Sequence, residues 1–202
     1  MSYWEHRKPV RRARAVDVGE VGRAAVALLD EGGLRALTLR AVAARLGVAP
    51  ASLYSRVESV DDLFDLALDE ALGRDPAIRR ALAGADLDAL MSACYRHLVR
   101  HRWACQVIAM RAPRGPNYLR LSERICLLLA GEGVEDPLSA AYALSNFVIG
   151  CATTAPVVDD ERSVPVDAEL APLYARLHAA HDVAAETIVV AGLVALRRHH
   201  QR

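Results

Sequence analysis

The sequence predicts an all-α protein in which a small N-terminal helical domain precedes a larger helical domain. Three observations support this fold class. Apolar residues recur every three or four positions along almost the whole chain, which is the spacing of amphipathic helices. No segment shows the alternation typical of strands. Of the 202 residues, 53% are hydrophobic and 25% are charged, and this composition favours a folded globular chain over a disordered one.

The first helix is expected to begin at Asp17 and to end at the glycine pair Gly32-Gly33. Its apolar positions follow three- and four-residue steps, and they are Val18, Val21, Ala25, Leu28 and Leu29. A glycine commonly ends a helix because it adopts the left-handed conformation at little cost. The segment therefore predicts about four helical turns with one apolar stripe.

Three more helices are predicted before residue 74. Thr38 is a suitable N-cap for a short helix that ends at Gly47. Pro50 fits the first turn of the next helix, where its missing N–H costs little, and this helix is expected to reach about Val57. Ser59 and Asp62 match a capping pattern that opens a fourth helix.

The rest of the chain also follows a helical pattern. Apolar spacing predicts helices over residues 86–101, 103–111, 117–130, 137–154 and 170–196. Residues 156–167 combine two prolines with four acids, and we expect a loop there.

The zero net charge of the chain conceals two regions of opposite sign. Residues 1–60 carry ten Lys and Arg against six Asp and Glu, whereas residues 61–202 carry fifteen against nineteen. Residues 1–16 are predicted to be a basic arm whose basic residues are Arg7, Lys8, Arg11, Arg12 and Arg14. Such an arm either contacts phosphates of a nucleic acid or is a solvated tail.

Several classes of protein are not expected. The N-terminus lacks an apolar secretory core, and no apolar run reaches the roughly 18 residues of a membrane span, so we expect no membrane association and a cytoplasmic location. The four cysteines have no CxxC spacing, which favours reduced core thiols over disulfides or a zinc site. Catalytic motifs such as GxSxG, HExxH and the P-loop are missing. We therefore expect no enzyme and no cofactor.

The motif that indicates function lies in residues 38–57, TLRAVAARLGVAPASLYSRV. A helix, a glycine turn and a short second helix make a helix-turn-helix, which places its second helix in the major groove of DNA. Hydroxyls and guanidinium groups suit phosphates and base edges, and small residues allow close approach. The predicted DNA-binding residues are Thr38, Arg40, Ala49, Pro50, Ala51, Ser52, Tyr54, Ser55 and Arg56. On the pattern alone, the alternative to a DNA-binding motif is a purely structural pair of helices that forms a corner of an all-α core.

The segments LTLRAVAARLGV and SLYSRVESVDDLFDLALDEAL resemble the tetracycline-repressor-like (TetR) family of transcriptional regulators. The resemblance implies a DNA-binding domain with its connecting helix over residues 17–73 and an effector-binding and dimerisation domain over 74–202. It also implies that Arg40 contacts a base and Tyr54 a phosphate. The family usually has a lysine at the position of Val60, so one phosphate contact is expected to be lost.

Effector-binding residues are expected in the second domain, because a ligand pocket needs apolar walls and a few polar groups. The candidates are Met91, Tyr95, Trp103, Met110, Tyr118, Tyr142, Asn146, Phe147 and His178; ordinary core packing is the alternative for each. The pairs His97/His101 and His178/His181 have helical spacing that permits two metal ligands. A metal site needs further ligands from elsewhere, and we expect none.

The predicted function is that of a repressor, a homodimer released from a palindromic double-stranded DNA operator by an unknown small-molecule effector. Two alternatives remain open. One is a regulator or activator without a small-molecule effector. The other is a helical ligand-binding or interaction module whose helix-turn-helix has weak or lost DNA affinity. The dependence of DNA binding on salt distinguishes the last case, because each phosphate contact contributes to the salt dependence.

Overall fold

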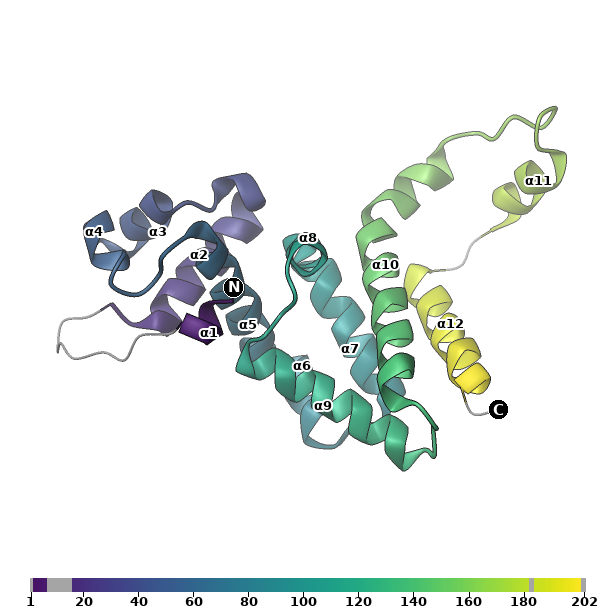
Figure 1. The fold of residues 1–202 in the computed structure, drawn as a ribbon. Coiled ribbons are helices and arrows are strands. Elements are labelled where there is room, and N and C mark those ends of the chain that lie inside the picture. The colour runs from purple at the N-terminus through teal and green to yellow at the C-terminus, as the bar shows by residue number, and fades with distance from the viewer. Residues whose placement is uncertain (1, 7–15, 182–183, 201–202) are drawn as a thin grey trace.

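The computed structural model describes residues 2–6, 16–181 and 184–200, and its regular elements over these residues are all helical (Figure 1). The prediction of an all-α fold is confirmed. The N-terminal part contains α1 (Tyr3–His6), α2 (Val18–Gly32), a 3-10 turn (Leu34–Ala36), α3 (Leu39–Leu46), α4 (Pro50–Leu53) and α5 (Val60–Arg74). The basic residues predicted between positions 7 and 14 lie outside the described residues.

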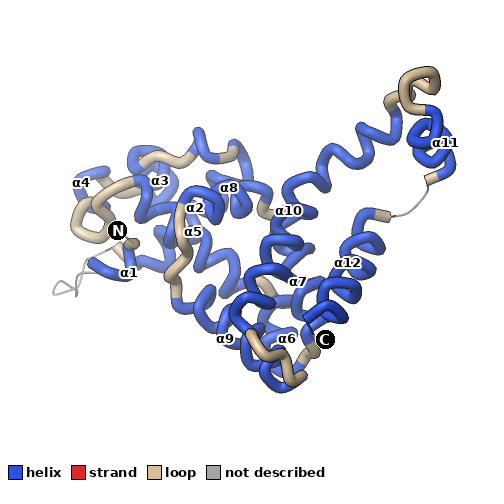
Figure 2. Tube along the Cα trace, turned by 45° about the vertical axis from the view of Figure 1, so that its right-hand side comes forward, coloured by secondary structure: helices blue, strands red, loops and turns tan. Residues whose placement is uncertain are grey.

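The second part of the chain packs beside α5 as a helical bundle. It contains α6 (Pro76–Gly84), α7 (Leu87–Arg100), α8 (Arg102–Met110), α9 (Pro116–Gly131), α10 (Pro137–Ser163), α11 (Pro172–Ala180) and α12 (Ala185–His200). Helix α10 packs against α7, α9 and α12. Helix α11 stands away from the bundle in both views (Figure 1 and Figure 2).

Local capping explains why the N-terminal helices begin where the sequence predicts. The side chains of Asp17, Thr38 and Ser59 accept hydrogen bonds from the backbone N–H three residues later, at Glu20, Ala41 and Asp62. Gly47 ends α3 in the left-handed conformation, with φ of 66°, which glycine adopts without steric cost. Helix α4 begins at Pro50 as predicted but ends at Leu53, about one turn earlier than expected.

The N-terminal helices share an apolar core. Helix α2 packs mainly on α5 and also contacts α3. Val21, Val42, Leu53 and Leu63 are completely buried at the centre of these contacts. Burying a residue of this size removes apolar surface from water and contributes about 1.5–3 kcal/mol to folding. Burial of these apolar side chains therefore holds the helix-turn-helix in place.

Four predictions about the elements need correction. Residues 2–6 are not part of a featureless arm, because α1 docks on α5. Helix α6 was not expected. The predicted loop over 156–167 is wrong in its first half, because α10 continues through Pro156 to Ser163. The single helix expected over 170–196 is two helices, α11 and α12, and Leu170 precedes them both.

The prediction that no apolar run reaches the length of a membrane span also needs correction. Residues Pro137–Val158 of α10 pass that test by length and composition. One side of this segment packs in the bundle, where Leu144, Val148 and Ala152 are buried. A core helix of a globular bundle satisfies the same test.

Candidate functional site

The helix-turn-helix presents its predicted DNA-binding residues on one exposed side. Leu53 and Val57 are completely buried on the other side, and they fix the orientation of α4. Tyr54, with 57% of its surface exposed, follows directly after α4. The other exposed members of the predicted set are Thr38, Arg40, Ala49, Pro50, Ala51, Ser52 and Ser55. Arg56 differs from these because it is half-buried.

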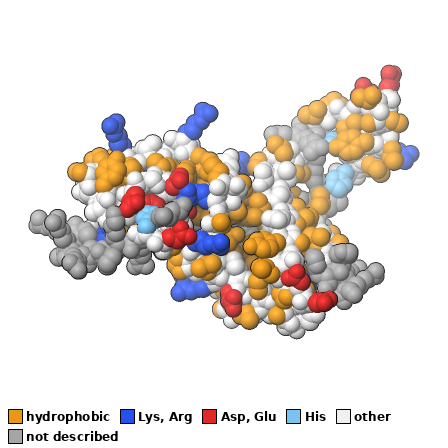
Figure 3. Space-filling model, in the orientation of Figure 1, with side chains coloured by type: hydrophobic (Ala, Val, Ile, Leu, Met, Phe, Trp, Pro, Cys, Tyr) orange, Lys and Arg blue, Asp and Glu red, His pale blue; other side chains and the backbone are white. Residues whose placement is uncertain are grey.

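The charges around this surface agree only in part with a DNA interface. Arg40 is exposed at the start of α3, where a guanidinium group suits a phosphate or a guanine edge. Arg45, on the same helix, is already paired with Glu31 of α2 at 2.5–2.7 Å. Figure 3 shows basic side chains that project from this end of the molecule. Val60 is the first residue of α5 and supplies no charge at the position where the family usually has lysine.

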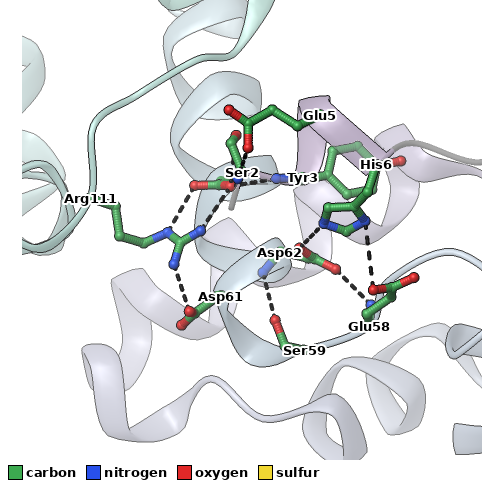
Figure 4. A network of polar contacts seen from close by, with 10 residues as sticks. Ser2, Tyr3, Glu5, His6, Glu58, Ser59, Asp61, Asp62 and Arg111 are labelled. Carbon is green, nitrogen blue, oxygen red and sulfur yellow. Dashed lines mark hydrogen bonds and ion pairs between the residues drawn. The ribbon is translucent and has the colours of Figure 1, made fainter.

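Helix α5 carries three buried carboxylates, and these were missed in the sequence. Asp62, Asp65 and Asp69 are at most 6% exposed, and their spacing of three and four residues places them along one side of the helix. Asp65 accepts hydrogen bonds from Ser2 Oγ (3.1 Å) and the Tyr3 N–H (2.8 Å). On its other side it accepts from Arg111 Nε at 3.1 Å and Nη2 at 3.2 Å. Figure 4 shows Arg111 and α1 meeting at α5.

Asp62 and Asp69, the other two buried carboxylates of α5, contact their own partners on either side of Asp65. Asp62 lies 3.0 Å from His6 Nε2 and accepts a hydrogen bond from the Glu58 N–H at 2.6 Å (Figure 4). Asp69 accepts from the N–H groups of Asn117 (2.8 Å) and Tyr118 (3.1 Å) at the start of α9. Burial raises the pKa of Asp69, while these amide hydrogen bonds oppose that rise.

The contact between Asp69 and α9 depends on the glycine that precedes the helix. A Cβ on Gly115 would overlap the Asp69 carboxylate. Because carboxylates of one helix bind both α1 and the start of α9, α5 connects the N-terminal helices to the bundle. The only signal for this in the sequence is three Asp residues at helical spacing inside an apolar segment.

A cavity lies inside the bundle, directly behind α5. Its inner chamber has a cavity volume of about 60 Å³. Most of its walls are aliphatic, and it is lined by Leu68, Leu72, Met91, Cys94, His97, Leu98, Ile108, Tyr118, Leu121, Ser122, Ile125, Ser145, Val148 and Ile149. A mainly apolar chamber with a few polar groups has the chemistry of a small-molecule site. Burial raises the pKa of Cys94 to about 12, so this thiol is neutral.

A wider cleft leads from the inner chamber towards the surface. It shares Ile108, Tyr118, Ser122, Ile125, Ser145 and Ile149 with the chamber, and its cavity volume is about 410 Å³. Tyr142 and Asn146 of α10 lie on its outer wall. Burial raises the pKa of Tyr118, so its hydroxyl is protonated at neutral pH and can donate a hydrogen bond.

The structure brings only some of the predicted effector residues together. Met91 and Tyr118 line the chamber, and Tyr118, Tyr142 and Asn146 line the cleft. The other five lie elsewhere. Trp103 donates a hydrogen bond to Asp30 of α2 (2.7 Å), and Phe147 lies against Gly192 of α12.

The remaining three predicted residues also lie outside the chamber and the cleft. Tyr95 is buried, and Met110 is exposed at the end of α8. His178 lies beside Tyr174 on α11. Four of the nine predicted residues thus line the chamber or the cleft, whereas most of the chamber lining is ordinary aliphatic packing.

The two histidines of α7 bind carboxylates. His97 Nδ1 lies 2.9 Å from Asp75, and His101 Nδ1 lies 2.7 Å from Asp30. Within the described ranges, no group of three His, Cys, Asp or Glu side chains is placed to hold a metal. Burial lowers the pKa of His97, although the hydrogen bond to Asp75 opposes this. His97 lines the chamber and was not among the predicted effector residues.

Comparison with known proteins agrees with both halves of this arrangement. Residues 23–67 match the model of the bacterial regulatory proteins of the tetR family, and residues 84–180 match the tetracyclin repressor-like C-terminal domain. The chain belongs to the TetR family. The resemblance that the sequence predicted is thereby confirmed.

Two curated transcriptional regulators align with part of this TetR-family chain. It is 42% identical over 131 residues to an HTH-type transcriptional regulator of Saccharopolyspora erythraea, which covers 63% of the chain. It is 34% identical over 158 residues to the HTH-type transcriptional repressor DrrR1 of Streptomyces coeruleorubidus, which covers 72% of the chain. Each match spans 56% of the relative's length.

A solved structure shows the same fold. The TetR-family protein ActR of Streptomyces coelicolor, in complex with (S)-DNPA, superposes with a TM-score of 0.70. The match covers 92% of this chain and 97% of ActR at 24% sequence identity.

Proposed function

We propose that this TetR-family chain is a transcriptional repressor that a small-molecule effector releases from a palindromic DNA operator. One observation carries the proposal: α5 packs against α2 of the helical domain that presents the exposed helix-turn-helix surface, and Leu68 and Leu72 of the same α5 line the apolar cavity. Members of the family bind DNA operators and small-molecule effectors and act as dimers. DrrR1 is named a repressor, and ActR was solved with a small molecule.

The connection between the two sites supports a specific mechanism. Tyr118 lines the chamber, and its backbone N–H donates to Asp69 of α5. An effector that displaces the start of α9 therefore pulls on α5, which packs along α2. The position of α4 relative to its dimer partner then changes. By thermodynamic linkage, the effector weakens DNA binding by the factor by which DNA weakens effector binding.

The proposed dimer follows from the exposed apolar residues of the last three helices. Ile188 and Val190 on α12 and Val157 on α10 are each more than 40% exposed. An isolated subunit rarely leaves such a surface uncovered. Two copies joined there would place two recognition helices on one palindrome, about 34–36 Å apart. We place the protein in the cytoplasm, where TetR-type regulators generally act and where operator DNA is accessible.

Fluorescence anisotropy of the full chain on labelled DNA fragments from upstream of its own gene tests the proposal. We expect one fragment to bind specifically, with a log–log salt slope that indicates several phosphate contacts. Tyr54→Phe and Arg40→Ala are expected to weaken binding, whereas Arg79→Ala, on the exposed side of α6, is the matched control. Equal, weak binding to every fragment by all four proteins would favour the alternative of a helical module without DNA affinity.

A further inference from the structure

The inner chamber contains one polar atom whose position is unusual. His97 is 2% exposed and lines the chamber, and its Nε2 atom is completely buried. Among the described side chains that line the chamber, His97 alone has a buried side-chain nitrogen without a hydrogen-bond partner. Most buried polar groups in proteins are satisfied, and an exception calls for an explanation.

The partners of Asp75 determine which nitrogen of His97 carries the proton. Asp75 accepts from the N–H groups of Ala77 (2.8 Å) and Ile78 (3.3 Å) and from Arg100 Nη1 (2.8 Å). Burial raises the pKa of this carboxyl, but the hydrogen bonds from His97 and the two amides lower it by more, so it is ionised. An ionised carboxylate only accepts, so Nδ1 of His97 must donate to it.

The ring of His97, a residue that lines the cavity, is therefore a neutral acceptor at Nε2. Burial lowers the pKa of His97, which keeps the ring neutral at neutral pH. With the proton on Nδ1, Nε2 presents a lone pair. Two of the other polar groups of the wall are weaker candidates: Ser122 Oγ already donates to the Tyr118 carbonyl (3.1 Å), and the Cys94 thiol is a poor hydrogen-bonding group.

We infer that His97 Nε2 is the polar anchor for the effector, and that the effector is a mainly apolar molecule bearing a hydroxyl or N–H donor. The inference rests on the proposed function of the cavity and deepens it. The aliphatic walls formed by Leu68, Met91 and Val148 accept the apolar body. The donor satisfies the unpaired nitrogen, and a molecule of the same shape without a donor leaves that nitrogen unsatisfied.

The anchor also places the effector close to the end of the connecting helix. Asp75, which receives the Nδ1 proton of His97, is the C-cap residue of α5 and the N-cap residue of α6. The His97 ring lies 4.9 Å from that of His101, which binds Asp30 of α2. An effector bound to Nε2 is therefore linked to the end of α5 through His97 and Asp75, and it lies against Leu68 and Leu72 of the same helix.

The test uses two small probes of nearly equal shape, 1-naphthol and 1-fluoronaphthalene, which differ in the presence of an O–H donor. Binding of each to the full-length protein is measured by isothermal titration calorimetry. We expect 1-naphthol to bind about tenfold more tightly, the effect of one buried hydrogen bond. His97→Asn retains a donor near the position of Nδ1 but lacks a group at Nε2, and we expect it to abolish the preference.

Two further variants separate this role from a structural one. His97→Gln places an amide oxygen near the position of Nε2, and we expect it to restore part of the preference for 1-naphthol. His101→Asn, one turn further along α7 and outside the chamber lining, should leave the preference unchanged. Circular dichroism and operator affinity of the same preparations show whether each variant is folded.

The outcomes distinguish the anchor from the proposed function. Equal binding of both probes by the wild-type protein overturns the anchor and leaves the cavity as a ligand site. Absence of binding by either probe, with operator affinity intact, also overturns it and leaves the DNA-binding part of the proposed function. Loss of the preference in His97→Asn, with partial recovery in His97→Gln, supports it.

Discussion

The helices up to α7 and those from α10 onwards bury their apolar residues to different extents. Between residues 16 and 100, Tyr54 is the only large apolar side chain described as exposed, and it belongs to the predicted DNA surface. From α10 onwards the exposed set comprises Leu138, Tyr142, Val157, Val164, Leu170, Leu173, Tyr174, Leu177, Ile188 and Val190. Figure 3 shows apolar side chains gathered over the projecting α11 end.

This difference shows that the two regions depend on different partners. The helix-turn-helix and α5 bury their apolar side within one subunit. Helices α10–α12 bury some of their apolar residues in the bundle, such as Leu144 and Leu193, and leave many others exposed. The exposed residues are what we expect of a dimerisation region. Sequence variation is therefore expected to affect subunit stability mainly through the first region and assembly mainly through the second.

The largest expected effect comes from breaking the closed core of the first region. Leu53→Ala removes a completely buried side chain beneath the recognition surface, and we expect the free energy of unfolding to fall by about 2–5 kcal/mol. Chemical denaturation measures this loss. Leu170→Ala, at a site 85% exposed, is the control and should change it by less than about 0.5 kcal/mol. Similar losses in both variants would contradict the comparison.

The next largest effect is expected at the contact between Asp65 of α5 and Arg111, which directly follows α8. Asp65→Ala leaves Arg111 without its buried partner and α1 without its acceptor, and breaking a buried charge pair costs about 3–5 kcal/mol when both charges are fully buried. Arg111 is 17% exposed, so we expect about 2–3 kcal/mol. Asp61→Ala removes the exposed partner of the same arginine and should cost less than 1 kcal/mol.

An additional readout tests whether this contact transmits the effector signal. If α5 connects the two sites, Asp65→Ala should also reduce the effect of a cavity ligand on operator affinity. An Asp65→Ala protein with unchanged stability and unchanged ligand response would show that the carboxylates of α5 do not connect the regions.

A smaller effect is expected from acid. The pKa of His97 is lowered in the folded protein from 6.5 in the unfolded chain. As the pH falls below 6.5, the unfolded chain takes up a proton that the folded chain does not, so stability decreases. The pKa of Asp75 is also lowered, and its contribution is lost only below pH 3.8.

Urea denaturation between pH 7.5 and pH 4.5 measures this dependence. We expect the difference in stability between the wild-type protein and His97→Asn to shrink as the pH decreases through this range, because the variant lacks the group that titrates. A difference that is constant with pH would contradict the assignment of a neutral, buried His97.

The smallest expected effect concerns the surface of the first region. Val60→Lys introduces a positive charge at the first residue of α5, where the family usually has a lysine. We expect operator affinity to increase severalfold and the log–log salt slope to steepen by about one unit. Anisotropy at several salt concentrations measures both, with Val60→Met as the uncharged control. No change in slope would mean that this end of α5 does not approach the DNA backbone.

The elements that the sequence predicted well are those whose ends depend on neighbouring residues. Asp17, Thr38 and Ser59 cap helices through bonds three residues away, and such signals can be read locally. The loop expected after Thr154 was wrong because a proline removes only one amide donor, and α10 continues through Pro156.

The candidate site was harder to predict because its decisive contacts are distant in sequence. Asp65 and Arg111 are 46 residues apart, and His101 and Asp30 are 71 apart. His97 and His101 have spacing that suits a metal pair, and only the positions of Asp75 and Asp30 show that each has a carboxylate partner. The exposed residues of α3 and α4 needed no such information, because the motif that carries them is continuous.

The positions of the two tryptophans have a practical consequence. Trp103 is bonded to Asp30 of α2, and Trp4 lies against the carboxylates of α5 and the loop before α9. These are the only tryptophans in the chain, and both are at the boundary between the DNA-binding helices and the bundle. Light at 295 nm excites tryptophan selectively, so the fluorescence of Trp4 and Trp103 reports whether this boundary opens. The unlabelled protein carries its own optical reporter, with which collections of compounds can be screened before any operator is known.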